Sequence, residues 1–258
     1  MRPFISVITI AFNSEKTIEE TIKSVIEQNY NNKEYIIIDG GSTDGTIDII
    51  KKYEKSISYW VSEPDKGISD AFNKGIKAAK GDIIGIVNSD DQYLPGALEI
   101  VAKNFEEKID VYRGSILIHE ERKDDYTYEP SMKFGMLPIK VNVCHLPTFI
   151  NRRAYEKYGV YDISFKLAMD LDLLRRFYRK GAKFKKINAV LGRFNVGGLS
   201  TEAGIKRGFD ERRKVILNNG GNMLFVAIYD FVLVLVSVYK KIIRLFGANY
   251  RKIRYKQR

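Results

Sequence analysis

Residues 82–91, which read DIIGIVNSDD, constrain the fold more than any other stretch of the chain. Uncharged, mostly β-branched residues run directly into a polar tip that carries two adjacent carboxylates, Asp90 and Asp91. A short apolar run of this kind predicts a strand buried on both faces. Ligands of open α/β sheets bind where such strands end, so the tip is a candidate site for a divalent cation and a phosphate-bearing ligand. The alternative is an acidic turn that caps the next helix, with Pro95 in the first turn of that helix.

The size and composition of the chain indicate a globular protein with a full core. It has 258 residues, 45% of them hydrophobic, which suits one large domain or one domain plus an appendage. The single cysteine, Cys144, excludes an intramolecular disulfide and fits a reducing compartment. Strand-like sequence follows Met1 directly, so we expect no signal peptide.

Positive charge is concentrated at the C-terminus. From Gly220 onward there are eight Lys or Arg residues and one acid, Asp230, so this segment supplies +7 of the net charge of +11. The rest of the chain carries only +4, which argues against a body that binds nucleic acid. We therefore expect a globular domain at residues 1–219 and a separate C-terminal segment at residues 220–258.

Strands and helices alternate along the first half of the chain. Apolar runs predict strands near 4–10, 35–38, 57–61 and 82–88, with amphipathic helices between them. This alternation predicts an α/β fold with a mostly parallel, Rossmann-like sheet and flanking helices. A polar or acidic group follows each strand: Asn13, Asp39, Asp65 and the Asp90–Asp91 tip. Because parallel strands end at one edge of a sheet, we expect these groups to converge on one crevice.

The second half of the chain is less regular. Short strands are predicted at 111–113, 116–118, 126–128 and 187–194, and an apolar segment at 141–150 holds His145. Helices are predicted at 153–158 and 169–179, the second with Leu173, Leu174 and Phe177 on its inner face.

The C-terminal segment combines an apolar helix with a basic tail. Met223 to Tyr239 contains one charged residue, Asp230, and is followed by Lys240, Lys241 and further basic residues. This pattern predicts a helix that associates with an anionic membrane surface and lies in the interface rather than spanning the bilayer. A hydrophobic helix docked on the body or in an oligomer interface is the alternative.

Several motifs, in this order, resemble the family 2 glycosyltransferases, inverting enzymes with the GT-A fold. The resemblance covers about Phe4 to Ser200. It rests on the segments 6–13 (SVITIAFN), 38–46 (IDGGSTDGT), 65–67 (DKG), 81–82 (GD) and 88–91 (NSDD), and downstream on His145, 159–165 and 170–173 (DLDL). Each motif alone is weak, whereas the ordered set is specific.

The resemblance implies a nucleotide-sugar donor whose base is uracil, guanine or thymine. The loop at Asn13 and the carboxylate of Asp39 would hold the nucleoside, although Asp39 could instead cap the Gly40–Gly41 turn. Asp91 would ligate Mg²⁺ or Mn²⁺ at the diphosphate, with Asp90 near the ribose or donor sugar. A hard cation bound through oxygen neutralises the charge that develops on the leaving diphosphate. Asp44 is read as structural and is left outside the site.

The resemblance also implies a general base in an acidic pair, usually Glu-Asp, at the start of a late helix. This chain has Met169-Asp170 at that place, so the Asp is kept and the Glu is missing. We assign Asp170 as the base; the alternative is that it only stabilises a helix N-terminus. Asp172 would point away from Asp170 on a helix and could pair with Arg175 or Arg176.

Four further residues are candidates for substrate contact by the same resemblance. His145 would lie on the acceptor side, unless it is a packed core histidine. Asp65 and Lys66 would line the donor sugar, or form a solvated turn. Arg193 and the loop at 197–200 match a segment that closes over the diphosphate in relatives, although Arg193 could be a surface strand residue. Arginine suits such a contact because it binds phosphate with two N–H groups.

These residues together predict an inverting glycosyltransferase that moves a sugar from a nucleotide-sugar to a hydroxyl acceptor. A basic, apolar C-terminal segment suits a glycan acceptor on a polyprenyl lipid at the cytoplasmic face of the inner membrane, in surface polysaccharide or lipopolysaccharide assembly. A non-catalytic sugar-nucleotide-binding or membrane-interaction module with the same fold is the alternative, favoured by the missing Glu before Asp170.

Overall fold

The computed structural model describes residues 2–120, 124–132, 144–196 and 205–245. Within these residues the strands are β1 (Ile5–Ala11), β2 (Lys33–Asp39), β3 (Tyr59–Ser62), β4 (Ile83–Asn88), β5 (Gln92–Tyr93), β6 (Val111–His119), β7 (Tyr126–Tyr128), β8 (Thr148–Asn151) and β9 (Phe184–Asn195). The helices are α1 (Ile18–Ile26), α2 (Thr46–Lys52), α3 (Ile68–Ala78), α4 (Ala97–Lys103), α5 (Arg152–Tyr158), α6 (Met169–Arg179), α8 (Ile205–Asn218) and α9 (Met223–Leu245), with one short 3-10 turn, η1 (Glu54–Ser56).

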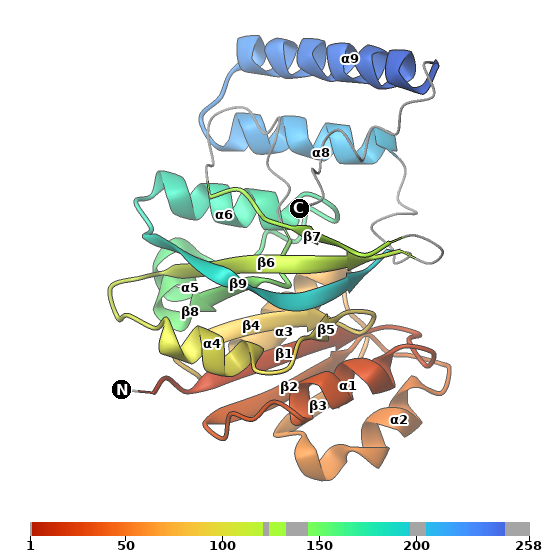
Figure 1. Ribbon diagram of the computed structural model, residues 1–258, viewed down its shortest axis with the longest axis vertical. Coiled ribbons are helices and arrows are strands. Elements are labelled where there is room, and N and C mark those ends of the chain that lie inside the picture. The colour runs from red at the N-terminus through yellow and green to blue at the C-terminus, as the bar shows by residue number, and fades with distance from the viewer. Residues whose placement is uncertain (1, 121–123, 133–143, 197–204, 246–258) are drawn as a thin grey trace.

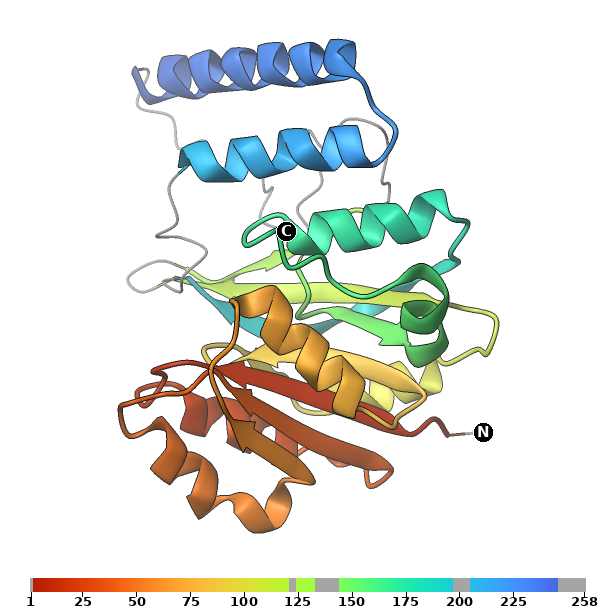
Figure 2. The same ribbon diagram turned by 180° about the vertical axis from the view of Figure 1, so that it is seen from behind.

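A single sheet runs through the molecule in the order β3-β2-β1-β4-β8-β6-β9-β5, with β7 paired to β6. The pairs β1–β2, β1–β4, β2–β3 and β6–β9 are parallel. Antiparallel β8 joins β4 to β6, and β5 and β7 are antiparallel additions to β9 and β6. Helices cover both faces of the sheet (Figures 1 and 2). The predicted α/β fold with a mostly parallel sheet is confirmed.

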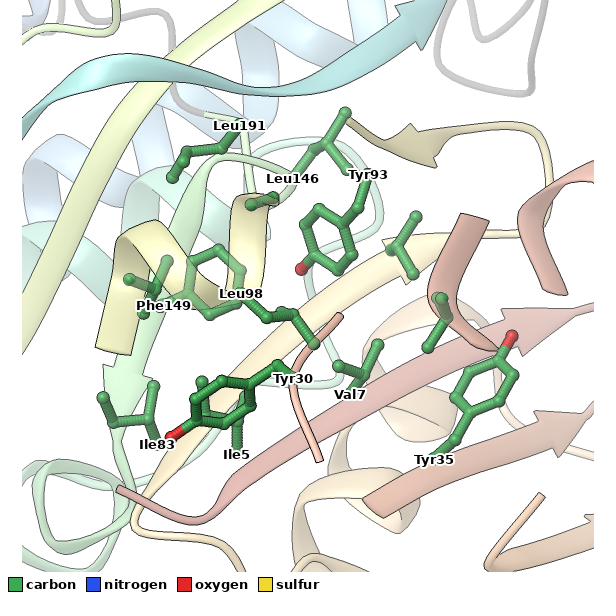
Figure 3. Packing of buried hydrophobic residues seen from close by; sticks show 14 of the residues in the cluster. Ile5, Val7, Tyr30, Tyr35, Ile83, Tyr93, Leu98, Leu146, Phe149 and Leu191 are labelled. Atoms are coloured by element: carbon green, nitrogen blue, oxygen red, sulfur yellow. The ribbon is translucent and has the colours of Figure 1, made fainter. Parts of the chain in front are cut away.

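Strand β4 is buried on both faces, as its apolar run predicted. Ile84 and Ile86 belong to a core cluster that also contains residues of α3 and α6. Ile83 and Val87 point to the other cluster, under α1 and α4, where Figure 3 shows the packing. The alternation of side chains along a strand places successive residues in opposite layers. The acidic tip therefore projects from the centre of the sheet, between two packed layers.

Most predicted ends lie within two residues of those observed, but the strands predicted at 111–113 and 116–118 are one strand, β6, whose register shifts between Arg113 and Ile116 interrupt the pattern. Strand β9 begins three residues earlier than predicted. Helix α6 has the predicted bounds, whereas β3 begins at Tyr59, two residues later than predicted. The delay has a local cause, because η1 precedes the strand and Ile57 N still donates to the carbonyl of Glu54 at 3.0 Å. The short strand β5, directly after Asp91, was not predicted because two residues carry no periodicity.

The C-terminal helices α8 and α9 form a layer beyond α6 (Figures 1 and 2). Helix α9 packs on α8 through a small core of Ile216, Val226 and Tyr229. Arg213 Nε donates to Asp230 Oδ1 at 2.9 Å across the same pair of helices. No helix in the described part of the chain is both long enough and apolar enough to cross a bilayer. Residues 246–258 of the basic tail lie outside the described residues.

Candidate active site

The acidic tip after β4 is held by residues from two distant elements. Thr21 Oγ1 donates to the carbonyl of Asp91 at 2.7 Å. The backbone N of Asn195, the last residue of β9, donates to Asp91 Oδ1 at 3.2 Å, and its side-chain Nδ2 donates to the carbonyl of Asp90 at 2.6 Å. No side chain caps the next helix, α4, whose N-cap is Gly96. The tip is thus a fixed turn and not a helix cap.

Two oxygens of this turn have the environment of a cation ligand. Asp91 is fully buried, and its Oδ2 has no hydrogen-bond partner among the described residues. The same holds for Oδ1 of Asn88, three residues earlier. Buried polar atoms are nearly always paired, so an orphaned carboxylate oxygen is a position where a bound ion is expected. Carboxylate and amide oxygens are the donors that Mg²⁺ and Mn²⁺ accept, so the residues present fit the predicted metal.

The two carboxylates of the tip are buried close together, an environment in which a bound cation would stabilise their charged forms. Burial raises the pKa of Asp91 to about 8, and the neighbouring charge of Asp90 adds to this rise. Burial also raises the pKa of Asp90. No group of three or more His, Cys, Asp or Glu side chains gathers as a metal centre in the described residues. One or two carboxylates plus phosphate oxygens, the usual complement of Mg²⁺, would therefore have to hold the ion.

Asp170 lies in the first turn of α6 and is bonded to two other segments. Its Oδ2 lies 3.2 Å from His145 Nδ1, and its Oδ1 accepts a hydrogen bond of 3.2 Å from the Tyr161 hydroxyl. Phe72 of α3 packs against both partner rings, with centroids 5.3 Å from His145 and 5.0 Å from Tyr161. The Asp170 side chain is 13% exposed. This carboxylate is oriented by side chains and does not cap the backbone of its own helix.

His145 bonds to Asp170 and lies close enough to the acidic tip to be affected by its charges. Burial lowers the pKa of its imidazole, but the charge and hydrogen bond of Asp170, together with the charges of Asp91 and Asp90, raise it overall above the usual value. Its Nε2 is buried and has no hydrogen-bond partner among the described residues. The structure therefore brings four predicted residues into one charge cluster. Asp90 and Asp91 follow β4, His145 precedes β8, and Asp170 lies in α6.

Asp39 ends β2 and is fully buried. Its Oδ2 accepts from the backbone N of Gly41 and Ser42 and from Ser62 Oγ, and its Oδ1 accepts from Ser42 Oγ. The carboxylate thus caps the glycine turn, which was the alternative role. Contact with a nucleoside stays a prediction.

The loops after β1, β2 and β3 meet as the shared sheet edge predicted. Asn13 has a left-handed backbone (φ 48°), and its Oδ1 accepts from the backbone N of Thr43. An added Cβ at Gly40 would lie 2.6 Å from Asp65 Oδ2, so a larger residue there would displace this carboxylate from its place beside the glycine turn. Ser14 Oγ in the first loop lies 2.7 Å from Ser89 Oγ in the acidic turn.

Three other predicted residues are placed as follows. Lys66 is exposed, and its backbone N donates to Asp70 Oδ2. Asp44 is structural as expected, because its Oδ1 accepts from the backbone N and hydroxyl of Thr46 at the start of α2. Arg193 is in β9, opposite Gln92, and its Nε is buried with no hydrogen-bond partner among the described residues. The 197–200 loop lies outside those residues.

Sequence reasoning did not find three residues at this site: Tyr161, Asn195 and Arg113. Arg113 is 1% exposed, and its Nε donates to Thr148 Oγ1 at 3.2 Å. Burial lowers its pKa to about 10, against the charges of Cys144 and Asp170. The sequence did contain a signal for Arg113, which is a charged residue within an apolar strand. Arginine is rarely buried without a partner, so its place in that strand could have indicated a role at a site. Tyr161 and Asn195 gave no such signal, because only the fold brings them to the two carboxylates.

Solved structures share this fold. TarS 1–349 of S. aureus, solved with UDP-GlcNAc, matches with a TM-score of 0.67 at 18% identity, covering 87% of this chain and 71% of that TarS chain.

The mannosyltransferase PcManGT of Pyrobaculum calidifontis, solved with GDP-Man and Mn²⁺, matches with a TM-score of 0.66 at 17% identity, covering 89% of this chain and 69% of PcManGT. The curled, mostly parallel sheet with an acidic turn at its centre therefore defines a protein of the GT-A fold class.

The sequence comparison gives the family. The family model described as "Glycosyl transferase family 2" matches residues 6–174, well over half of the chain, and the protein belongs to this family. The uncharacterized glycosyltransferase MT1564 of Mycobacterium tuberculosis (strain CDC 1551 / Oshkosh) is 33% identical over 183 residues, covering 67% of this chain and 68% of the relative. A PGL/p-HBAD biosynthesis glycosyltransferase of Mycobacterium bovis (strain BCG / Pasteur 1173P2) is 26% identical over 206 residues, covering 77% and 79%. The chain is a glycosyltransferase.

Proposed function

We propose that the protein transfers a sugar, with inversion, from a nucleotide-sugar to a hydroxyl acceptor. The observation that carries this proposal is the oriented Asp170 carboxylate, which lies in the same buried charge cluster as the acidic tip at Asp90 and Asp91. A base on one side and a cation site on the other are the two groups that a single displacement at an anomeric carbon requires.

The proton and the two bonds are assigned as follows. The Asp170 carboxylate accepts the proton of the acceptor hydroxyl, whose oxygen forms a bond to the anomeric carbon of the donor. The bond between that carbon and the diphosphate oxygen breaks, and the nucleoside diphosphate leaves with the electron pair. His145 and Tyr161 hold the carboxylate in place through their contacts of 3.2 Å. Such positioning contributes to the rate because the base need not search for its geometry.

The acidic tip would hold the leaving group through a divalent cation. Asp91 and the neighbouring Asn88 oxygen are the residues that would bind Mg²⁺ or Mn²⁺. When bound, the ion supplies positive charge to the departing diphosphate. Bound Mn²⁺ and GDP-Man in PcManGT, and UDP-GlcNAc in TarS, support a nucleotide-sugar donor. Asn13, Asp39, Asp65, Lys66 and Arg193 remain our candidates for contacts with that donor.

A donor panel tests the function directly. UDP-, GDP- and dTDP-sugars are added to the purified chain with Mn²⁺, first to measure melting temperature and then to measure release of nucleoside diphosphate over vesicles of bacterial total lipid extract. We expect one donor to raise the melting temperature and to be consumed. A donor that binds but releases no diphosphate over any lipid would instead favour the non-catalytic sugar-nucleotide-binding module.

We further propose that α9 attaches the protein to an anionic membrane and that the acceptor is a lipid-linked glycan. One face of α9 packs on α8, and the opposite face is apolar and exposed. A row of five exposed apolar side chains runs along this outer face: Leu224, Ile228, Phe231, Leu235 and Val238. These positions recur every three or four residues, so they form one stripe along the helix. Lys240, Lys241 and Arg244 follow in sequence. A stripe of this kind next to basic residues is typical of helices that lie in the membrane interface, here the cytoplasmic face of the inner membrane.

Replacing Leu224, Phe231 and Leu235 by serine is expected to abolish most vesicle binding. The triple variant leaves the net charge unchanged and removes three large exposed side chains, each 51% or more exposed. Co-sedimentation with vesicles containing anionic phospholipid should fall at least about tenfold, because interfacial binding scales with buried apolar area. The matched control replaces Tyr59, Val160 and Ile163 by serine; these exposed apolar side chains lie elsewhere on the surface, so vesicle binding should persist. Wild-type protein that stays in the supernatant but elutes as an oligomer would assign the stripe to a subunit interface.

A further inference from the structure

The backbone that leads into α6, the helix that carries Asp170, is held by a carboxylate from α8. Glu211 Oε2 accepts from the backbone N of Leu167 at 2.7 Å and of Ala168 at 2.9 Å. Lys166 N donates to both oxygens, at 3.2 Å to Oε1 and 3.1 Å to Oε2. Glu211 is 5% exposed, so these hydrogen bonds are largely shielded from solvent. Three consecutive backbone N–H groups thus converge on one side chain, more than forty residues away in the sequence.

These bonds fix the backbone that leads into α6. The N-cap of α6 is Ala168, which has no side-chain acceptor of its own. Glu211 binds the N–H of this N-cap residue and of the two residues before it. A carboxylate at this end also interacts favourably with the helix dipole. Glu211 therefore holds the segment from which α6 starts, and Asp170 is the second residue of that helix.

Further contacts hold α8 and the α6 start in one rigid unit. Asn219 Nδ2, just beyond α8, donates to Asp172 Oδ1 at 3.3 Å, and Asp172 is also paired with Arg176, as the sequence suggested. Ser69 Oγ of α3 donates to the carbonyl of Phe165, immediately before the capped residues, at 2.7 Å. The Asp170 carboxylate meets His145 and Tyr161, which belong to other segments. A shift of the α6 start would lengthen both of these 3.2 Å contacts.

We propose that Glu211 is a positioning residue for Asp170 and that α8 is thereby part of the catalytic unit. The proposal rests on the function proposed above, in which Asp170 is the base. Glu211 touches neither donor nor acceptor in this assignment; it acts by fixing the backbone from which Asp170 projects. The rate of sugar transfer should then depend on Glu211 only while the Asp170 carboxylate is present.

A double-mutant cycle tests this dependence. Glu211→Ala and Glu211→Gln are each made in the wild-type and in the Asp170→Asn protein, and release of nucleoside diphosphate is measured with the donor that the panel identifies, with Mn²⁺ and the same lipid vesicles. Glu211→Ala should lower kcat about tenfold in the wild-type background, since a small misplacement of a catalytic group is costly. In the Asp170→Asn background it should lower kcat less than about twofold, because the two residues are coupled. Glu211→Gln keeps one acceptor oxygen and should lie between wild type and Glu211→Ala.

The controls separate positioning from a general loss of structure. Asp210→Ala removes the neighbouring carboxylate, which is exposed and pairs only locally with Arg213, and should change kcat less than about twofold. The Kd for the donor should stay unchanged in every folded variant. If Glu211→Ala does not fold, Glu211→Gln carries the cycle. Equal losses in both backgrounds would overturn the positioning role. An unimpaired Asp170→Asn protein would instead remove the base assignment of the proposed function, a distinguishable result.

Discussion

Replacing Asp170 by asparagine is expected to slow sugar transfer about 10³-fold, the usual contribution of a general base. The asparagine is nearly isosteric and its amide can still bond to Tyr161 or His145, but it cannot accept the proton of the acceptor hydroxyl. The site around it should therefore remain intact. The measurement is nucleoside diphosphate release at saturating donor, together with donor binding by calorimetry. We expect a large loss in kcat and an unchanged Kd for the donor.

The neighbouring Asp172→Asn variant is the control for this prediction. Asp172 is on the same helix, but it is 4% exposed and is bonded to Arg176 and Asn219. Its replacement should lower the melting temperature, and it should lower kcat by at most about tenfold, far less than Asp170→Asn, because Asp172 lies on another face of α6 and acts only by tying this helix to α8. Full turnover by Asp170→Asn with normal donor binding would show that another group takes the proton, and His145 with its buried Nε2 would be the first to test.

Replacing Asp91 by asparagine is expected to remove Mn²⁺-dependent donor binding and to lower the turnover about 10²-fold or more, since the variant loses the anionic oxygen that a hard cation prefers. In the wild type, Mn²⁺ should raise the melting temperature; in the variant, it should not. Asp48→Asn, which alters an exposed carboxylate on α2, is the control and should keep the Mn²⁺ response. A Mn²⁺ response that survives in Asp91→Asn would place the cation elsewhere.

The pH dependence of the melting temperature is a second way to test the environment of Asp91. Its folded-state pKa of about 8 lies above the ordinary value of 3.8. Below pH 3.8 this carboxyl is protonated in both the folded and the unfolded chain, so its raised pKa costs no stability. As the pH rises from 3.8 to about 8, the unfolded chain loses the proton while the folded chain keeps it, and the free energy of unfolding falls. Above about pH 8 the full cost is present. Metal-free Asp91→Asn protein should therefore melt higher than wild type at pH 8.5, and the difference should shrink toward pH 5. Below pH 8, Mn²⁺ binding should release a proton, which calorimetry in buffers of different ionisation enthalpy detects.

The sequence pattern within short segments was sufficient to predict the strand and the helix that carry the site. The apolar run before Asn88 predicted a strand with both faces buried, and the burial of Ile83 to Val87 on two opposite clusters follows from it. The 3.6-residue spacing of Leu173, Leu174 and Phe177 gave α6 its observed bounds. In both cases the information lies within about ten consecutive residues, because side-chain direction repeats with the period of the element.

The hydrogen-bond partners of the carboxylates could not be predicted from such local patterns. Asn195 bonds to the tip from β9, Tyr161 bonds to Asp170, and Glu211 of α8 binds the backbone that leads into α6. Asp39 was predicted at the correct strand end, but its bonds to the glycine turn became visible only in the structure. Hydrogen bonds between distant segments depend on how layers pack, and packing leaves no periodic trace in the sequence.

By itself, the sequence determined the approximate positions of the strands in the first half of the chain, the mostly parallel sheet and the identity of the acidic groups at one edge of it, because hydrophobic periodicity and the alternation of strands with helices are local properties. Only the tertiary structure decided that Asp91 keeps an orphaned oxygen, that His145 bonds to Asp170 within the field of the charges at the tip, and that one face of α9 is covered while the other is open. Burial and charge coupling arise when separate layers close over one another, and no single segment contains that information.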